Sequence, residues 1–491
     1  MLRTEHNKSL AATIELSLDS PMFQELGPDA RALLGVIAFF PQGVDEDNIG
    51  WLFPTISNGA STFNKFCILS LTYRSNGFIT MLAPLRDYLS PKDPKSSPLL
   101  CTTKECYFTR MSVDHDPDKP GPGEARWITS EDVNVEHLLD IFTSIDANSV
   151  DVWEACTGFT WHLAWHKRRP TVLRPKIEGL ADDHPSKPKC LYQLAQLLEA
   201  VGSPAERRQL LIHTLKLERE RGNDRRVART LRTLSDANRL MGLRKEGIRL
   251  IQEALEIFER LGDTVEQAWC LNYLAWLLFS ERLFSAAEEA ASRSIKLLPE
   301  KGEEFLVCES HHVLGSAYCF KRKWRKAIHH FEVALGIASS LNLNHSLFWL
   351  HLSLADLLST EGKFDDAHAH IGRAMSYAAD IPYYQGRGME HQAMVFYKQH
   401  RLEEARPWVL RALDVFEKLG AAKNLESCRE FFQWIEEEMN NPVALYFDGE
   451  LLEMVLLPTP TDSLSSQVSD GTISHVCSDI PFISGATSGE P

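Results

Sequence analysis

The histidine pair His162 and His166 is the first feature of this sequence that could do chemistry. The two residues lie four positions apart in a segment predicted to be helical, so both imidazole rings share one helix face and could bind a metal ion. The segment has no glutamate where metalloprotease helices carry one, and Trp161 and Trp165 flank the histidines. Three later pairs divide between helix faces: His311 and His312, His329 and His330, and His368 and His370. We therefore interpret these histidines as polar positions of amphipathic helices and expect no metal site.

The motifs that mark common enzyme sites are missing. The sequence contains no GxxxxGK[ST] phosphate loop, no GxSxG nucleophile elbow and no GxGxxG dinucleotide loop. Its 10 cysteines are scattered, with Cys101 and Cys106 the closest pair and no CxxC, which is typical of reduced and mostly buried thiols. The carboxylate run at 436–438 is expected on an exposed helix face. We predict a protein that is not an enzyme and has no catalytic residue, cofactor or metal.

The composition bounds the class of protein. The chain has 491 residues, 44% hydrophobic and 24% charged, an ordinary balance for a soluble protein of two or three domains. No stretch approaches the roughly 20 apolar residues of a membrane helix, and the N-terminal segment MLRTEHNKSLAATIELSLDS lacks the apolar core of a secretory signal. A net charge of −15 opposes binding to a phosphate backbone. We expect a cytoplasmic protein that binds neither nucleic acid nor membranes.

One pattern recurs from about residue 188 to residue 439. Aligning one small position in the second helix of each copy gives a step of 40 residues four times and 38 once: Arg207, Gly247, Ala287, Ala327, Ala367 and Ala405. The same register selects Ala195, Ser235, Ala275, Gly315, Ala355 and Ala393 in the first helix, and Thr214, Ala254, Ser294, Ala334, Ala374 and Ala412 later in the second. Small side chains let helix backbones approach closely, and such hairpins bury their apolar faces by stacking. The repeat predicts an all-α fold, an α-solenoid of about six helical hairpins with a 40-residue period.

The fourth copy makes the chain similar to tetratricopeptide-repeat proteins. The family pattern is matched there by Leu314, Gly315, Tyr318, Ala327, Phe331 and Ala334. The step of 40 residues exceeds the family period of about 34, which implies longer helices, and the first copy has Arg207 where alanine is expected, as in a capping repeat. The resemblance covers about half of the chain. It implies a solenoid that holds other proteins.

Residues 28–92 carry different motifs. A predicted helix ends in Phe39-Phe40-Pro41-Gln42-Gly43, a short helix ends in Leu52-Phe53-Pro54, and Met81 precedes Leu85-Arg86-Asp87-Tyr88. Between them, residues 61–76 are predicted to form another helix. These motifs resemble the winged-helix segment of NACHT and NB-ARC signalling ATPases. Taken together with the repeats, they make the chain similar to a fungal signalling protein of that class. The phosphate loop is missing and Met1 lies close to residue 28, so we expect a member without its ATPase domain.

The whole chain is therefore predicted to divide into five segments. Residues 1–27 form an N-terminal extension, 28–92 the winged-helix-like domain, 93–187 a loop and helical linker, 188–440 the repeat array, and 441–491 a mostly disordered tail. Within the linker, the polar composition predicts a long loop over 93–130, followed by helices over 131–145 and 150–167. The tail is rich in Ser, Thr, Pro and Gly and has few charges, which is typical of disorder.

The resemblance places the first helix of each hairpin along a concave groove, which names candidate binding residues. They are Arg229, Arg232, Asp236, Arg239, Trp269, Asn272, Trp276, Phe279, Glu309, His312, Ser316, Trp349 and Asp356. The aromatic middle of the groove would suit an apolar anchor, and the three arginines would suit carboxylate or phosphate groups. Alternatively, the tryptophans belong to the core between repeats.

These observations predict an interaction scaffold or sensor arm that binds partner proteins in the groove, with an acidic segment as a match for the arginines. One alternative is a truncated fragment of a nucleotide-dependent signalling switch, against which the missing phosphate loop argues. Another is a winged-helix DNA-binding regulator, against which the negative charge argues. The oligomeric state stays open.

Overall fold

The computed structural model describes residues 12–440 except 55, 57–58, 115–125, 165–168, 202–203, 299–302, 379–380 and 420. The chain divides into two compact units, Met1–Gly222 and Asn223–Pro491, here called unit 1 and unit 2. The predicted tail at 441–491 lies outside the described residues, as does His166. None of the described helices combines the length and hydropathy that a membrane crossing requires.

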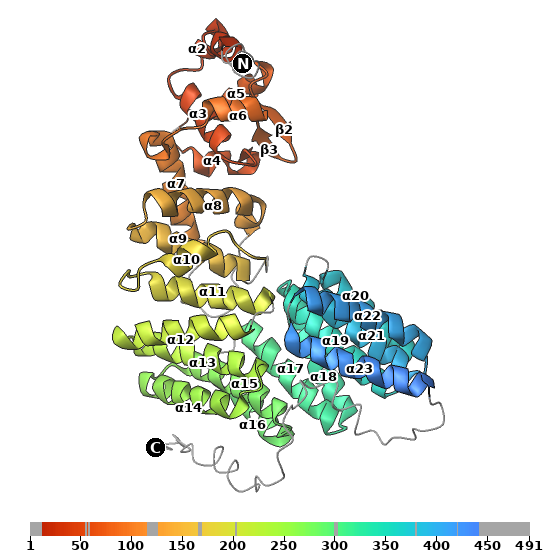
Figure 1. The fold of residues 1–491 in the computed structure, drawn as a ribbon. Helices are drawn as coiled ribbons and strands as arrows, with labels where there is room; N and C mark the ends of the chain where they lie inside the picture. Colours follow the sequence, from red (N-terminus) through yellow and green to blue (C-terminus); the bar gives the residue numbers. More distant parts are fainter. Residues whose placement is uncertain are drawn as a thin grey trace, which may run out of the picture. The chain divides into compact units, whose positions relative to one another are not determined.

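Unit 1 begins with short helices around a small sheet (Figure 1). After a helical stretch at 12–18 come α2 (Pro21–Gln24), α3 (Asp29–Phe39), β1 (Val44–Asp45), η1 (Glu46–Asn48), α4 (Ile49–Leu52), α5 (Gly59–Ile68), β2 (Tyr73–Ser75), β3 (Phe78–Thr80) and α6 (Ala83–Leu89). The sheet is antiparallel in the order β1-β3-β2. A small N-terminal domain before the repeats is therefore present, while its winged-helix resemblance stays a prediction.

The helix predicted over residues 61–76 is wrong in its second half. Helix α5 ends at Ile68, and β2 and β3 form a hairpin that pairs Ser75 with Phe78. The two residues of its turn, Asn76 and Gly77, both have positive φ, at 53° and 83°. Asn-Gly is the preferred pair for a two-residue hairpin turn of this hand, because its twist matches that of the flanking strands. The turn residues therefore override the apolar spacing that suggested a helix.

The long loop predicted over residues 93–130 is also wrong for much of its length. After η2 (Pro94–Ser96), helix α7 runs over Pro98–Asp114. Its buried residues Leu100, Thr103, Tyr107 and Met111 are spaced by three or four positions, so they form one face of the helix. The polar residues that suggested a loop occupy the remaining faces.

The rest of unit 1 consists of α8 (Arg126–Ile145), α9 (Val150–His162), α10 (Arg174–Gly179), α11 (Lys187–Val201) and α12 (Pro204–Glu220). These helices share one hydrophobic core with the small domain. A buried carboxylate of α8 helps to join them: Glu131 accepts hydrogen bonds from Asn48 Nδ2 at 2.8 Å, Tyr107 Oη at 3.0 Å and Asn134 Nδ2 at 2.7 Å. Burial raises the pKa of Glu131, and these three donors partly offset that rise.

Unit 2 is an array of helix pairs. Its first helices are α13 (Asp224–Leu240), α15 (Thr264–Ser280), α17 (Glu304–Phe320), α19 (Asn344–Thr360) and α21 (Pro382–Lys398). The second helices are α14 (Arg244–Leu261), α16 (Phe284–Leu297), α18 (Trp324–Ser340), α20 (Phe364–Tyr377) and α22 (Leu402–Lys418), and α23 (Ala422–Asn440) follows them. With α11 and α12 of unit 1, these make the six predicted hairpins. The predicted fold class, an α-solenoid of tetratricopeptide-like hairpins after a small domain, is confirmed.

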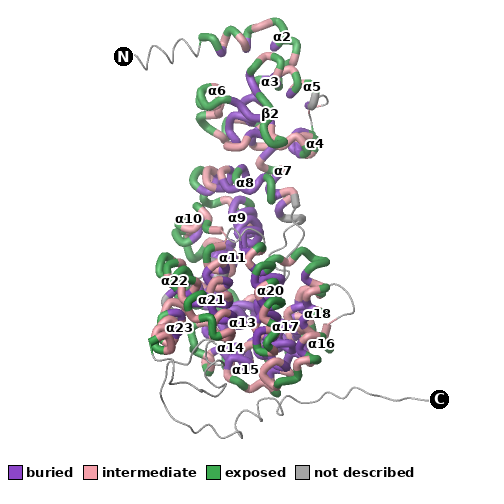
Figure 2. Tube along the Cα trace, turned by 90° about the vertical axis from the view of Figure 1, so that its right-hand side faces the viewer, coloured by how far each residue is buried: buried purple, intermediate pink, exposed green. Residues whose placement is uncertain are grey.

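The repeat register agrees with the burial of the residues, which Figure 2 shows along the chain. All eighteen aligned small-residue positions are buried, including the Arg207 of the first copy. Helix pairs close through equivalent turns whose central residue has positive φ: Gly242, Arg282, Arg322, Gly362 and His400. In each turn the next residue donates its backbone N–H to a carbonyl five positions earlier, as Leu283 does to Leu278, the pattern of a Schellman cap.

Candidate functional site

The first helices of unit 2 form the closely spaced side of the array. They pack directly on one another, α13 on α15, α15 on α17, α17 on α19 and α19 on α21, whereas the second helices make no comparable approach in the described part of unit 2. The side on which successive repeats lie closest is the inner side of a curved solenoid. We call this surface the inner face. It is defined by the equivalent position of each first helix, six residues before the aligned small residue: Arg229, Trp269, Glu309, Trp349 and Arg387.

At the start of the inner face, two predicted binding arginines are engaged within the chain. Arg229 and Arg232 of α13 both bond to Glu266 of α15, and all three side chains are buried. Burial alone would raise the pKa of Glu266, but the charges of Arg232 and Arg229 outweigh it and lower this pKa. Arg239 lies 2.7 Å from Asp236. Arg229 and Arg232 therefore join successive repeats through one shared carboxylate, and Arg239 pairs with a carboxylate of its own helix.

The predicted groove tryptophans fall into two classes. Trp269 is 5% exposed, its ring stacks on Phe305 of the next repeat at 5.7 Å, and the Arg232 guanidinium lies 5.2 Å from it. Trp269 is thus part of the core between repeats, the alternative considered from the sequence. Trp276 and Trp349 are only partly buried.

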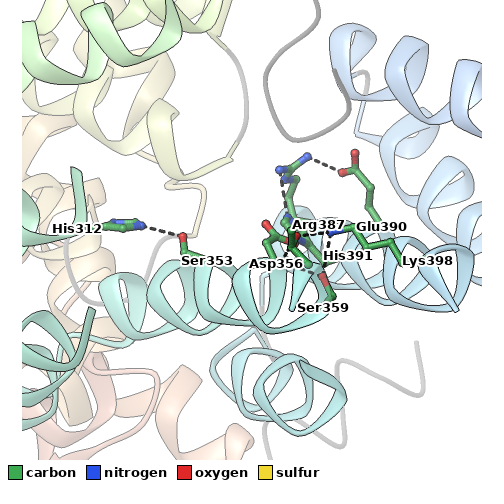
Figure 3. Close-up of polar contacts among 9 residues, drawn as sticks. His312, Ser353, Asp356, Ser359, Arg387, Glu390, His391 and Lys398 are labelled. Atoms are coloured by element: carbon green, nitrogen blue, oxygen red, sulfur yellow. Dashed lines mark hydrogen bonds and ion pairs between the residues drawn. The ribbon is translucent and has the colours of Figure 1, made fainter. Parts of the chain in front are cut away.

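Trp276 belongs to a small aromatic and polar group. Its ring meets the ring of His312 of α17 edge-on at 5.1 Å. His312 Nε2 lies 3.0 Å from Ser353 Oγ of α19, so this histidine touches three successive first helices (Figure 3). Burial lowers the pKa of His312 to about 4. Beside it, Asn272 Nδ2 donates to Ser310 Oγ at 3.1 Å.

Trp349 and Asp356 of α19 face a charged group on α21 that the sequence did not predict; Figure 3 shows Asp356 with this group. His391 Nδ1 lies 2.9 Å from Asp356 Oδ1, and Arg387 bonds to Glu390. The Arg387 guanidinium also lies 5.7 Å from the Trp349 ring. These contacts balance positive against negative charge, as at the other end of the inner face.

Lys398, at the end of α21, completes this charged group. Its Nζ donates to Ser359 Oγ at 2.9 Å and to Thr360 Oγ1 at 3.1 Å. Burial lowers the pKa of Lys398, against the opposing effect of the Asp356 charge. An amine held by two hydroxyls of α19 ties the sixth hairpin to the fifth.

A register signal could have found the missed residues. Arg387 and Glu390 precede Ala393 by six and three positions, as Trp349 and Leu352 precede Ala355. Extending the groove positions to the sixth copy, which follows after 38 rather than 40 residues, would have named both. His391 and Lys398 lie outside those positions, and only the contacts identify them.

The Asp356–His391 pair is not arranged to activate a nucleophile. An Asp356–His391 pair could serve as a base, but His391 Nε2 faces Arg387 Nη2 at 3.4 Å, so a cation occupies the place where a nucleophile would have to sit. Among the described residues, no three histidine, cysteine or carboxylate side chains converge to hold a metal ion. His162, of the first histidine pair considered, is buried on α9.

Comparison with known proteins supports the repeat assignment. The tetratricopeptide-repeat family model matches residues 226–300, which span most of the helix pairs α13–α14 and α15–α16. The array is a tetratricopeptide-like solenoid. No curated protein matches the sequence.

Several solved structures are similar to parts of this tetratricopeptide-like chain. A Rap protein complexed with competence and sporulation factor is 11% identical, with a TM-score of 0.46 over 69% of this chain and 98% of that one. A STAND protein with a tetratricopeptide-repeat sensor from Pyrococcus horikoshii is 14% identical, with a TM-score of 0.49 over 87% and 66%. The apo quorum sensor NprR from B. thuringiensis is 13% identical, with a TM-score of 0.40 over 68% and 98%.

Proposed function

We propose that unit 2 binds an extended or helical segment of a partner protein along its inner face, with Trp276 and Trp349 as the apolar anchors. The observation that carries this proposal is the contrast among the tryptophans. Trp269 is buried in the core between repeats, where its ring stacks on Phe305. Trp276 and Trp349 keep exposed surface, and their helices pack against neighbouring helices. Partly exposed aromatic rings in a firmly packed surface are the residues that most often dominate a protein interface.

The charge distribution defines the partner further. Arg229 and Arg232 share Glu266, Arg239 has Asp236, and Arg387 has Glu390, so the arginines of the inner face come with carboxylates of their own. An incoming acidic segment would have to compete with these carboxylates. The pairing therefore favours a segment whose main contacts are apolar side chains over the acidic segment expected from the sequence.

The polar groups around the anchors would supply the remaining contacts. Partly buried Asp356 lies about two helical turns beyond Trp349 on α19, and Glu309 precedes His312 on α17. Carboxylates on the inner face can accept hydrogen bonds from the backbone N–H groups of an extended peptide. Apolar anchoring with a few backbone hydrogen bonds is the combination that this surface offers.

A displayed random-peptide library, selected against the full chain, would provide a probe for this proposal. We expect Trp276→Ala and Trp349→Ala each to weaken binding of the selected peptide by about 2 kcal/mol, which is roughly 30-fold in Kd. The matched control is Leu410→Ala on the second helix α22, where the leucine is 41% exposed. Circular dichroism would verify that each variant folds. Equal affinities for all variants, or equal weakening by Leu410→Ala, would contradict the proposal.

A further inference from the structure

Histidines are concentrated in one section of unit 2. Of the 18 histidines in the chain, 10 fall between residues 311 and 400, whereas the helix pairs α13–α14 and α15–α16 have none. Several of the ten make contacts between helices, as His312 does with Ser353 and His391 with Asp356. The section α17–α20 therefore differs from the preceding repeats in what holds its helices together.

Two of these contacts are the same contact repeated. His311 of α17 faces His330 of α18 with 2.8 Å between their Nδ1 atoms, and His351 of α19 faces His370 of α20 with 2.9 Å between theirs. Both members advance by 40 residues from one pair to the next, which is the repeat step. Each pair therefore joins the two helices of one hairpin at the equivalent place.

The ring geometry shows what the pairs can bind. In both pairs the ring centroids are 5.0 Å apart while the facing nitrogens are 2.8–2.9 Å apart, so the rings meet nearly head-on. One Nδ1 must carry the proton and the other must accept it. Two nitrogens that point at each other share a proton; to chelate a metal they would have to point at a common third position.

The groups around each pair leave the neutral form favoured. His330 stacks on Tyr318 and has Lys326 and exposed His329 on its own helix. Glu288 of α16 is a neighbouring carboxylate. His351 stacks on Tyr377, and Arg373 and Asp366 of α20 flank its pair. Burial, followed by the partner histidine, lowers the pKa of His311 and of His351 to about 4. Burial also lowers the pKa of His330 and of His370.

We propose that the pairs His311–His330 and His351–His370 are a proton-sensitive latch, which holds the hairpins α17–α18 and α19–α20 closed at neutral pH and releases them as the pH falls. A first added proton can be shared between the facing nitrogens. A second cannot, because both rings would then present N–H groups to each other and two like charges would meet across 2.8–2.9 Å.

The direction of the effect follows from proton linkage. A histidine in an open hairpin titrates near 6.5, whereas in the latch at least one member of each pair resists protonation. The opened state therefore binds more protons, and the closed state loses stability as the pH falls below 6.5 towards about 4. At pH 5 one such histidine per pair favours opening by about 20-fold relative to pH 7.

Amide hydrogen exchange of the full chain at pH 7 and pH 5, corrected for intrinsic exchange rates, tests the latch. We expect α17–α20 to open at least about 20-fold more at pH 5, while the histidine-free helices α13–α16 keep their protection. At pH 5 most carboxylates are still charged, so they contribute little. An equal change in both sections, or none in α17–α20, would overturn the proposal.

Two variants make the test specific. The double variant His311→Gln with His330→Gln should reduce the pH response of α17–α18 by about 20-fold, to the part that buried His312 contributes, and should leave the response of α19–α20 unchanged. The control His329→Gln removes the adjacent exposed histidine of the same helix and should retain both responses. A pH response of α17–α18 that is undiminished in the double variant would contradict the latch. If the double variant does not fold, two measurements on the unmodified chain decide whether the latch exists. They are the comparison of exchange in α17–α20 with exchange in α13–α16, and an NMR titration of the histidines.

Discussion

Two glycine-to-alanine substitutions in adjacent helices should change stability in opposite directions. Gly315 of α17 lies against Phe331 of α18, and a Cβ at this glycine would come within 2.6 Å of two atoms of the ring. Phe331 is fully buried, so its ring cannot move out into solvent to relieve this contact. Gly336 of α18 is exposed, and nothing lies within 4 Å of the place where its Cβ would be.

The expected magnitudes follow from these two environments. Replacing a helical glycine by alanine gains about 1 kcal/mol from helix propensity, and Gly336→Ala should show this gain in full. At Gly315 the same gain is opposed by overpacking, which costs about 1–3 kcal/mol and should fall in the upper half of that range against a buried ring. We therefore expect Gly315→Ala to lose about 1–2 kcal/mol, a difference of about 2–3 kcal/mol between the variants.

Urea unfolding of the full chain, followed by circular dichroism and by tryptophan fluorescence, would measure both changes as shifts of the transition of unit 2. Adding Phe331→Leu to Gly315→Ala should recover part of the loss, because the smaller side chain makes room for the methyl group; the two substitutions should therefore be non-additive. If Gly315→Ala were as stable as the unmodified chain, the packing described for the fourth repeat would be refuted.

Three further predictions concern other parts of the array. Arg282→Gly and Arg322→Gly should each raise the melting temperature through a gain of about 0.5–1 kcal/mol, because both arginines have positive φ, at 61° and 54°; Gly242→Ala at the equivalent turn should lower it. Glu266→Ala removes the carboxylate that two buried arginines share and should cost about 3–5 kcal/mol in urea unfolding at pH 7. Because the pKa of Glu266 is lowered in the folded chain, this carboxylate contributes its full stabilisation above pH 4.5 and less at lower pH. A stability loss in Glu266→Ala that became larger on acidification would contradict this pairing. Trp269→Ala should cost about 3–5 kcal/mol of stability, and a neutral effect in a thermal melt would show that this ring is not part of the core.

The sequence predicted the array well because a constant step constrains many residues at once. Eighteen aligned positions had to be small or buried together, and all are buried. Local features without repetition were harder to predict. The hairpin at Asn76–Gly77 has a clear turn signal, but the apolar spacing before it favoured a helix, and the polar faces of α7 concealed its buried face.

The inner face was only partly predictable, because its contacts join residues of different repeats. The register placed Arg229 and Arg232 correctly on α13, but their partner Glu266 follows 37 and 34 residues later, on the first turn of α15. A list of groove positions names side chains one helix at a time and does not show which of them neutralise each other. For the same reason, the sequence did not show that Trp269 stacks on Phe305 of the next repeat while Trp276 stays partly exposed.

Hydrogen exchange of the full chain with and without a saturating selected peptide tests the proposed binding surface most directly. If the partner segment lies along the inner face, exchange should slow in the first helices α15, α17 and α19 and stay unchanged in the second helices α16, α18 and α20. Protection confined to the second helices or to unit 1, or no protection at saturation, would contradict the account.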